Sequence, residues 1–158
     1  MIKKLFLLFC LILLGCSSPS PHTPKPGSSE EAAIIHGLKL TVSAALNNQP
    51  LGIKINTLCV YGDYAHIAFT PTNPMGGEFN YDKTSYAVDK TQDPEDQFTD
   101  TDADAILHRI GGVWVVVVYG LHLHEPPDYM LDPNHWQNDP VYKQWPKQIL
   151  ACPQTNAG

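Results

Sequence analysis

The chain has 158 residues, a formal net charge of −6 at pH 7, 43% hydrophobic residues and 16% charged residues. Its length fits one domain. Its acidity argues against nucleic-acid binding, which depends on cationic side chains that displace counterions from phosphates. Acidity likewise disfavours adhesion to anionic headgroups. It would favour a cationic protein partner, and solubility is the alternative explanation for it.

Residues 1–15 have the pattern of an export signal, with two lysines before the apolar run Leu5–Leu14. The run is too short to span a bilayer, which takes about 20 apolar residues. The tetrapeptide Leu13–Cys16, LLGC, resembles the lipobox of bacterial lipoproteins. This resemblance implies cleavage before Cys16 and its acylation. With Ser17 rather than Asp next, it also implies anchoring in the outer membrane, facing the periplasm. Without the signal, 143 residues remain with a net charge of −8.

Residues 16–29 comprise the lipidated cysteine and a Ser/Pro-rich segment, which predicts an extended tether. At about 3 Å per residue it would lift the domain some 30–40 Å from the bilayer. A single domain is expected over residues 30–158. Its first element should be a helix over residues 30–48, because Ser28–Glu31 matches a capping box and apolar residues follow at helical spacing.

A first β-hairpin is predicted around the turn Gly62-Asp63, between strands Ile53–Tyr61 and Tyr64–Thr70. In that register Cys59 and His66 pair on one face of the sheet. The other face carries an apolar set that we expect under the helix: Leu58, Val60, Ala65, Ile67 and Phe69.

A second hairpin is predicted around Gly111-Gly112, between Ala103–Ile110 and Val113–Leu121. Its register opposes Arg109 and Trp114, a cation–π contact worth about 1 kcal/mol. The second strand is apolar on both faces. We therefore expect it at the centre of the sheet, covered by the helix and by the C-terminal tail.

The cysteines predict a disulfide. Cys10 leaves with the signal and Cys16 takes the lipid, so Cys59 and Cys152 remain in an oxidising compartment. Their bond would close a loop of 93 residues, worth about 4–5 kcal/mol in the chain-entropy model. It would also pin the tail to the sheet. The alternative, two free thiols in a redox or nucleophilic site, lacks a Cys-x-x-Cys pair and a nearby cation.

Together these elements predict an α+β fold, with an N-terminal helix packed on an antiparallel sheet of two β-hairpins. This is the style of cystatin-like and NTF2-like folds, and it carries no function by itself. The motifs Gly62–Ala65 and Ala105–Trp114, followed by a Trp/Pro-rich tail, resemble small exported bacterial α+β domains. These motifs are structural and imply no activity.

A candidate metal site follows the second hairpin. His122 and His124 alternate on an extended segment, so their imidazoles point the same way, and Asp128 follows closely. Such a set could begin a zinc or other transition-metal site. The alternative is a strand end with solvated histidines.

An acidic run, Asp100, Asp102 and Asp104, is similar to the start of a calcium loop. Ala105 stands where the turn glycine belongs, however, and Gly111 where the closing glutamate belongs. A different type of calcium site remains one interpretation, and solvated acids before a strand are the other.

For catalysis the sequence offers no nucleophile elbow, P-loop or dinucleotide fingerprint, so we expect no enzyme. A protein partner could bind the acidic loop 71–102, the aspartates Asp100, Asp102 and Asp104, and the hairpin ends beside Trp136 and Trp145. The sequence therefore predicts a non-catalytic binding module, in its most specific form an inhibitor or immunity-type protein. The alternatives are an envelope assembly accessory and a metal- or ligand-binding domain.

Overall fold

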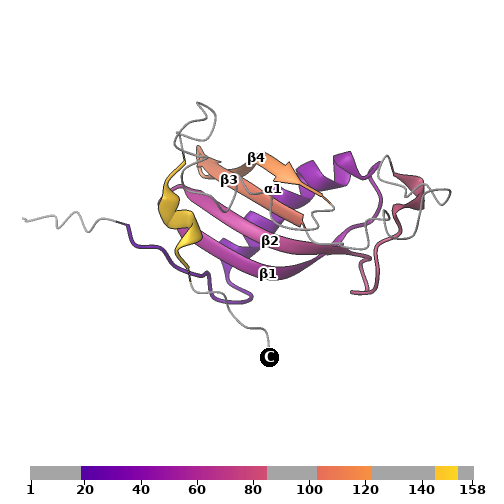
Figure 1. Ribbon diagram of the computed structural model, residues 1–158, viewed down its shortest axis with the longest axis horizontal. Helices are drawn as coiled ribbons and strands as arrows, with labels where there is room; N and C mark the ends of the chain where they lie inside the picture. Colours follow the sequence, from indigo (N-terminus) through magenta and orange to yellow (C-terminus); the bar gives the residue numbers. More distant parts are fainter. Residues whose placement is uncertain (1–18, 85–102, 122–144, 153–158) are drawn as a thin grey trace, which may run out of the picture.

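An α-helix lies across one face of a four-stranded antiparallel sheet (Figure 1). The computed structural model describes residues 19–84, 103–121 and 145–152. The strands follow chain order, β1-β2-β3-β4. No helix within these ranges is long and apolar enough to cross a membrane. The elements are α1 (Ser29–Ala45), β1 (Gly52–Tyr61), β2 (Tyr64–Thr72), η1 (Tyr81–Lys83), β3 (Ala103–Ile110), β4 (Val113–Gly120) and η3 (Lys147–Leu150).

The helix begins and ends close to the predicted positions. Ser28 is its N-cap and accepts a hydrogen bond from the backbone N–H of Glu31 at 3.2 Å. After Ala45 the chain turns through Asn47 and Asn48, both with φ of 56°. This left-handed region is one that asparagine tolerates better than most residues, so the pair stops the helix.

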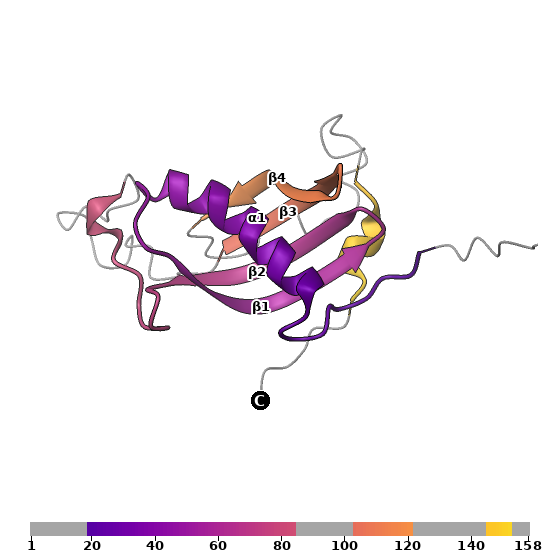
Figure 2. The ribbon, with the colours of Figure 1, turned by 180° about the vertical axis from the view of Figure 1, so that it is seen from behind.

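The first hairpin has the predicted register. Tyr61 pairs with Tyr64 and Cys59 with His66, which leaves the predicted apolar set on the face that α1 covers (Figure 2). The larger hydrophobic core lies between α1 and this face of the sheet. Its fully buried members include Ile34, Leu38, Val42, Ala65, Ile67, Phe69 and Leu107.

The second hairpin also has the predicted register, and Arg109 lies over the Trp114 ring at 5.4 Å from its centroid. The predicted central position of its second strand is wrong. Among the described strands β4 is the last and pairs only with β3. Its apolar residues divide by face: Trp114 packs in the core under α1, whereas Val113 and Val115 remain 57% and 43% exposed. An apolar run therefore cannot distinguish a central strand from an edge strand with an exposed apolar face.

The second face of the sheet, opposite α1, is covered in part by the C-terminal segment. This segment packs on β1, β2 and Ile106 of β3, whereas the prediction that it covers the strand after the second turn is met only at Val118, since Val113, Val115 and Val117 stay exposed. Ile149 of η3 is fully buried against Ile106 of β3, with Tyr61, Tyr64 and Trp145 around them. The predicted Cys59–Cys152 disulfide is present, with 5.5 Å between the two Cα atoms. It fixes η3 beside β1.

The segment that precedes the helix differs from the expected free tether. His22 forms an antiparallel bridge with Val60, with N–O distances of 2.9 and 2.8 Å, and Pro24 is buried. The His22 imidazole also lies 3.0 Å from the Glu30 carboxylate. The segment therefore pairs at His22 with the outer edge of β1, where the backbone groups of Val60 are free to bond another chain segment.

Candidate binding surfaces at the two ends of the sheet

The sheet has two distinct ends. Both hairpin turns, Gly62-Asp63 and Gly111-Gly112, lie at one end, together with η3 and the N-terminal segment (Figures 1 and 2). We call this the turn end. The opposite end, which we call the loop end, carries the turn Asn73–Gly77 after β2.

At the loop end, Asn73 organises a tight turn. Its side-chain oxygen accepts hydrogen bonds from the backbone N–H groups of Met75 and Gly77, at 2.8 and 3.1 Å. Backbone bonds also join Asn73 to Gly77 and Gly76. Gly76 has a φ of 83°, which favours glycine. The turn is therefore held by its own hydrogen bonds and does not depend on packing of its tip.

The tip of this turn is Met75, whose side chain is 97% exposed. Beside it lies a pocket of about 410 Å³ with Lys54 and Glu78 among its lining residues. Phe79 forms part of the wall and packs edge-on against Tyr81, with ring centroids 5.0 Å apart. The loop end thus offers a flexible apolar side chain next to a partly charged hollow.

At the turn end, an ion pair connects the two hairpins. The Asp63 carboxylate accepts hydrogen bonds from Nε and a terminal nitrogen of Arg109, at 2.9 and 2.7 Å. The Asp63 backbone oxygen also accepts from the Arg109 N–H at 2.7 Å. Asp63 therefore does more than shape its turn, because it fixes the first hairpin to β3.

The turn end also has an aromatic pocket, of about 440 Å³. The Tyr64 and His108 rings stack in parallel there, with centroids 4.3 Å apart. Tyr61 and Trp145 complete the aromatic lining. Tyr61 and Tyr64 come from the predicted hairpin, whereas His108 reaches them only through the pairing of β2 with β3.

A second ion pair lies in the middle of the sheet face opposite α1. His66 Nε2 lies 2.8 Å from Asp104 Oδ1, and their side chains are only 13% and 10% exposed. The expectation that Asp104 is a solvated acid is therefore wrong, because pairing of β2 with β3 brings it against His66. Its carboxylate is committed to this partner.

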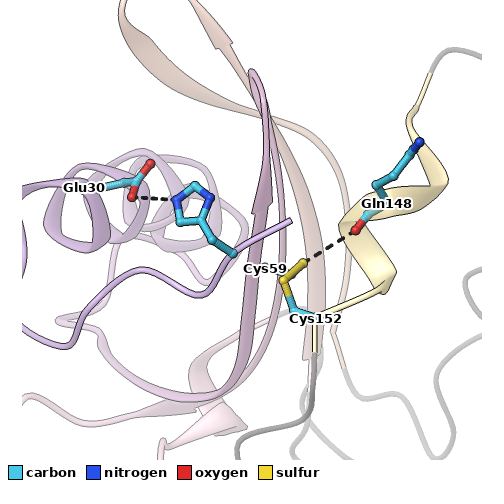
Figure 3. The surroundings of a disulfide bond; sticks show 5 residues. Glu30, Cys59, Gln148 and Cys152 are labelled. Atoms are coloured by element: carbon cyan, nitrogen blue, oxygen red, sulfur yellow. Dashed lines mark hydrogen bonds and ion pairs between the residues drawn. A yellow bond between two sulfur atoms is a disulfide. The ribbon is translucent and has the colours of Figure 1, made fainter. Parts of the chain in front are cut away.

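The disulfide joins this face to the C-terminal segment (Figure 3). Cys59 Sγ lies 3.7 Å from the carbonyl oxygen of Gln148 in η3. Since a disulfide sulfur has no hydrogen to donate, this is a packing contact. The pairing excludes the alternative of two free thiols in the oxidised protein.

The remaining predicted site residues fall in different places. The structure puts Trp145 at the turn end and Asp104 in the middle of the second face, so they do not form one surface. The others lie outside the described residues: Cys16, Asp100, Asp102, His122, His124, Asp128 and Trp136. Within the described ranges no three His, Cys, Asp or Glu side chains gather as metal ligands would. The zinc and calcium hypotheses stay predictions.

Comparisons with known proteins add no assignment: no family model, no curated protein and no solved structure matches the chain.

Proposed function

We propose that the protein is a lipoprotein of the outer membrane that binds a protein partner in the periplasm and catalyses no reaction. In its most specific form it is an inhibitor or immunity-type protein. The sequence LLGC ending at Cys16 supports the anchor. A helix laid across a four-stranded antiparallel sheet is compatible with a cystatin-like or NTF2-like fold, and we include this pair of folds in the proposal.

The observation that carries the binding role is Met75, 97% exposed on a turn that Asn73 braces. A braced turn loses little conformational freedom when a partner binds, so less of the contact energy is lost to ordering. Methionine is unbranched and polarizable, and it adapts to irregular apolar surfaces. The turn lies in the segment 71–102 that the sequence marks as a partner surface.

The partner expected here has an apolar site for Met75 and basic residues around it. The chain is acidic overall, with 16 acidic against 10 basic residues. Long-range attraction would speed the approach of a cationic protein. The pocket next to Met75, with Lys54 and Glu78 in its lining, could then receive one side chain of the partner.

Photo-crosslinking in living cells tests this role. A photoreactive benzoylphenylalanine would be introduced at Met75 and, as a control, at Leu40, which is 63% exposed on α1. We expect one discrete protein adduct from position 75 and none from position 40. With the captured protein purified, Met75→Asp should weaken binding by about tenfold or more, as expected for the centre of an interface. Leu40→Asp should leave binding unchanged.

The opposite results would count against the proposal. Identical adducts at both positions would indicate non-specific contact, and equal affinities of the two Asp variants would remove Met75 from the interface. The anchor has a separate test, the mass of the N-terminal peptide. That mass should correspond to a chain cleaved before Cys16 and carrying added acyl chains. The Cys16→Ala variant should show neither modification.

A further inference from the structure

The position of the N-terminal segment limits where the membrane can be. Pro19 lies beside the Gly62-Asp63 turn, and a β-carbon on Gly62 would be 3.8 Å from Pro19 Cγ. Cys16 precedes Pro19 by three residues. Three residues span at most about 11 Å. If Cys16 carries the lipid, as the proposed function requires, the turn end is close to the bilayer surface.

The side chains at the turn end suit that position. Ile110 and Val113 flank the glycine turn of the second hairpin, and each is 57% exposed. Two large aliphatic side chains at the tip of a hairpin can enter the apolar edge of a bilayer. Such an insertion is favourable because it removes exposed aliphatic surface from water. Val115, 43% exposed, extends this apolar surface along β4.

The aromatic pocket provides the second observation. Tyr61, Tyr64 and Trp145 line it at the same end of the sheet. Tyrosine and tryptophan are favoured at membrane–water interfaces, because the ring prefers the apolar side while the hydroxyl or N–H group stays hydrated. The packing of Tyr61, Tyr64 and Trp145 with Ile149 holds these rings in place.

The charges at the turn end do not oppose this placement. The chain is acidic, but the Asp63 carboxylate is paired with Arg109. Lys147 of η3 is exposed next to the pocket residue Pro146. With Lys25 before α1 and Glu30 and Glu31 in its first turn also counted, the described basic and acidic side chains at this end balance, in contrast to the net acidity of the whole chain.

We propose that the turn end rests in the interfacial layer of the membrane that holds the Cys16 lipid. Ile110 and Val113 enter its apolar edge, and Tyr61, Tyr64 and Trp145 lie at headgroup level. The loop end with Met75 then points away from the bilayer, toward partners in the periplasm. The domain is a surface-bound body of fixed orientation rather than a module on a long free tether.

The test uses the full acylated lipoprotein in vesicles of phosphatidylethanolamine and phosphatidylglycerol. Benzoylphenylalanine would be placed at Val113, and at Met75 as the matched exposed control. After illumination, mass spectrometry should find lipid adducts at position 113 and only background at position 75. Adding Ile110→Asp should lower the yield at position 113 to that background, whereas Leu40→Asp should not.

Each other outcome overturns the proposal in a recognisable way. Equal lipid adducts at both positions would mean that the domain has no fixed orientation. Protein–protein adducts at position 113 would mean that a second copy covers the tip. If the protein floats with the vesicles, Cys16 is acylated and position 113 yields no lipid adduct, then the orientation is wrong and the lipoprotein assignment stands. An unacylated Cys16 would refute both the orientation and the lipoprotein assignment.

Discussion

Substitution of Gly37 by alanine tests how closely the helix packs on the sheet. Gly37 is a buried residue in the middle of α1. A β-carbon placed there would overlap the backbone carbonyl oxygen of Trp114 and lie 3.2 Å from its Cβ. Because the obstacle is the backbone of β4, it cannot rotate away as a side-chain tip could. Either α1 or β4 must move.

Two opposing contributions set the magnitude. Alanine is the better helix former, which alone would stabilise the protein by about 0.8–1 kcal/mol. Forcing an extra carbon into a packed core costs about 1–3 kcal/mol. A backbone obstacle places the cost at the upper end of that range. We therefore expect Gly37→Ala to lower the free energy of unfolding by about 1–2 kcal/mol.

Urea denaturation of the oxidised protein, followed by circular dichroism, measures this change. The sign of the change in the free energy of unfolding shows whether the close contact or helix propensity dominates. A matched control is Ala33→Gly at an exposed position of the same helix, which isolates propensity and should cost about 1 kcal/mol. If Gly37→Ala instead raised the free energy of unfolding by a similar amount, propensity would be the only contribution. The close contact between α1 and β4 would then be refuted.

Three further changes test other parts of the structure. The double variant Cys59→Ala with Cys152→Ala should lose about 4–5 kcal/mol of unfolding free energy, since the bond closes 93 residues; a loss below about 1 kcal/mol in calorimetry would contradict the loop-closure account. Asp63→Asn removes a charge pair whose side chains are 41% and 58% exposed, so the loss should stay within about 1 kcal/mol and vanish in high salt. His22→Pro removes the N–H that donates to the Val60 carbonyl oxygen and so leaves the bridge with one of its two bonds; the weakened bridge should open more often, which should accelerate hydrogen exchange at the Val60 amide, the donor to the His22 carbonyl, whereas His22→Ala should leave it slow.

The sequence was most informative where the signal is local. The Ser28 cap and the paired asparagines at 47 and 48 act within one helical turn, and the structure uses both. The capping box is only half formed, because the Glu31 carboxylate accepts from the Gly27 N–H while the Ser28 N–H donates to Lys25. Each two-residue turn sets the register of its own hairpin, which is why the pairings of Cys59 with His66 and Arg109 with Trp114 could be predicted.

The candidate surfaces depend on contacts that no local pattern encodes. The stacking of Tyr64 on His108 and the ion pair of His66 with Asp104 both require β2 to pair with β3, across a long intervening segment. The placement of β4 at the edge depends on strand order, which an apolar run does not reveal. For Asn73 a signal existed: an asparagine followed by Pro-Met-Gly-Gly is a strong turn pattern.

The bond between Cys59 and Cys152 also determines how the domain would respond to mechanical load. Tension applied between Cys16 and Cys152 follows the covalent chain to Cys59 and then crosses directly through sulfur. It would first strip His22 from β1 and could then unravel α1. Strands β2, β3 and β4 would lie in a closed covalent ring that bears none of the pull, so they would survive the extension as a template for refolding.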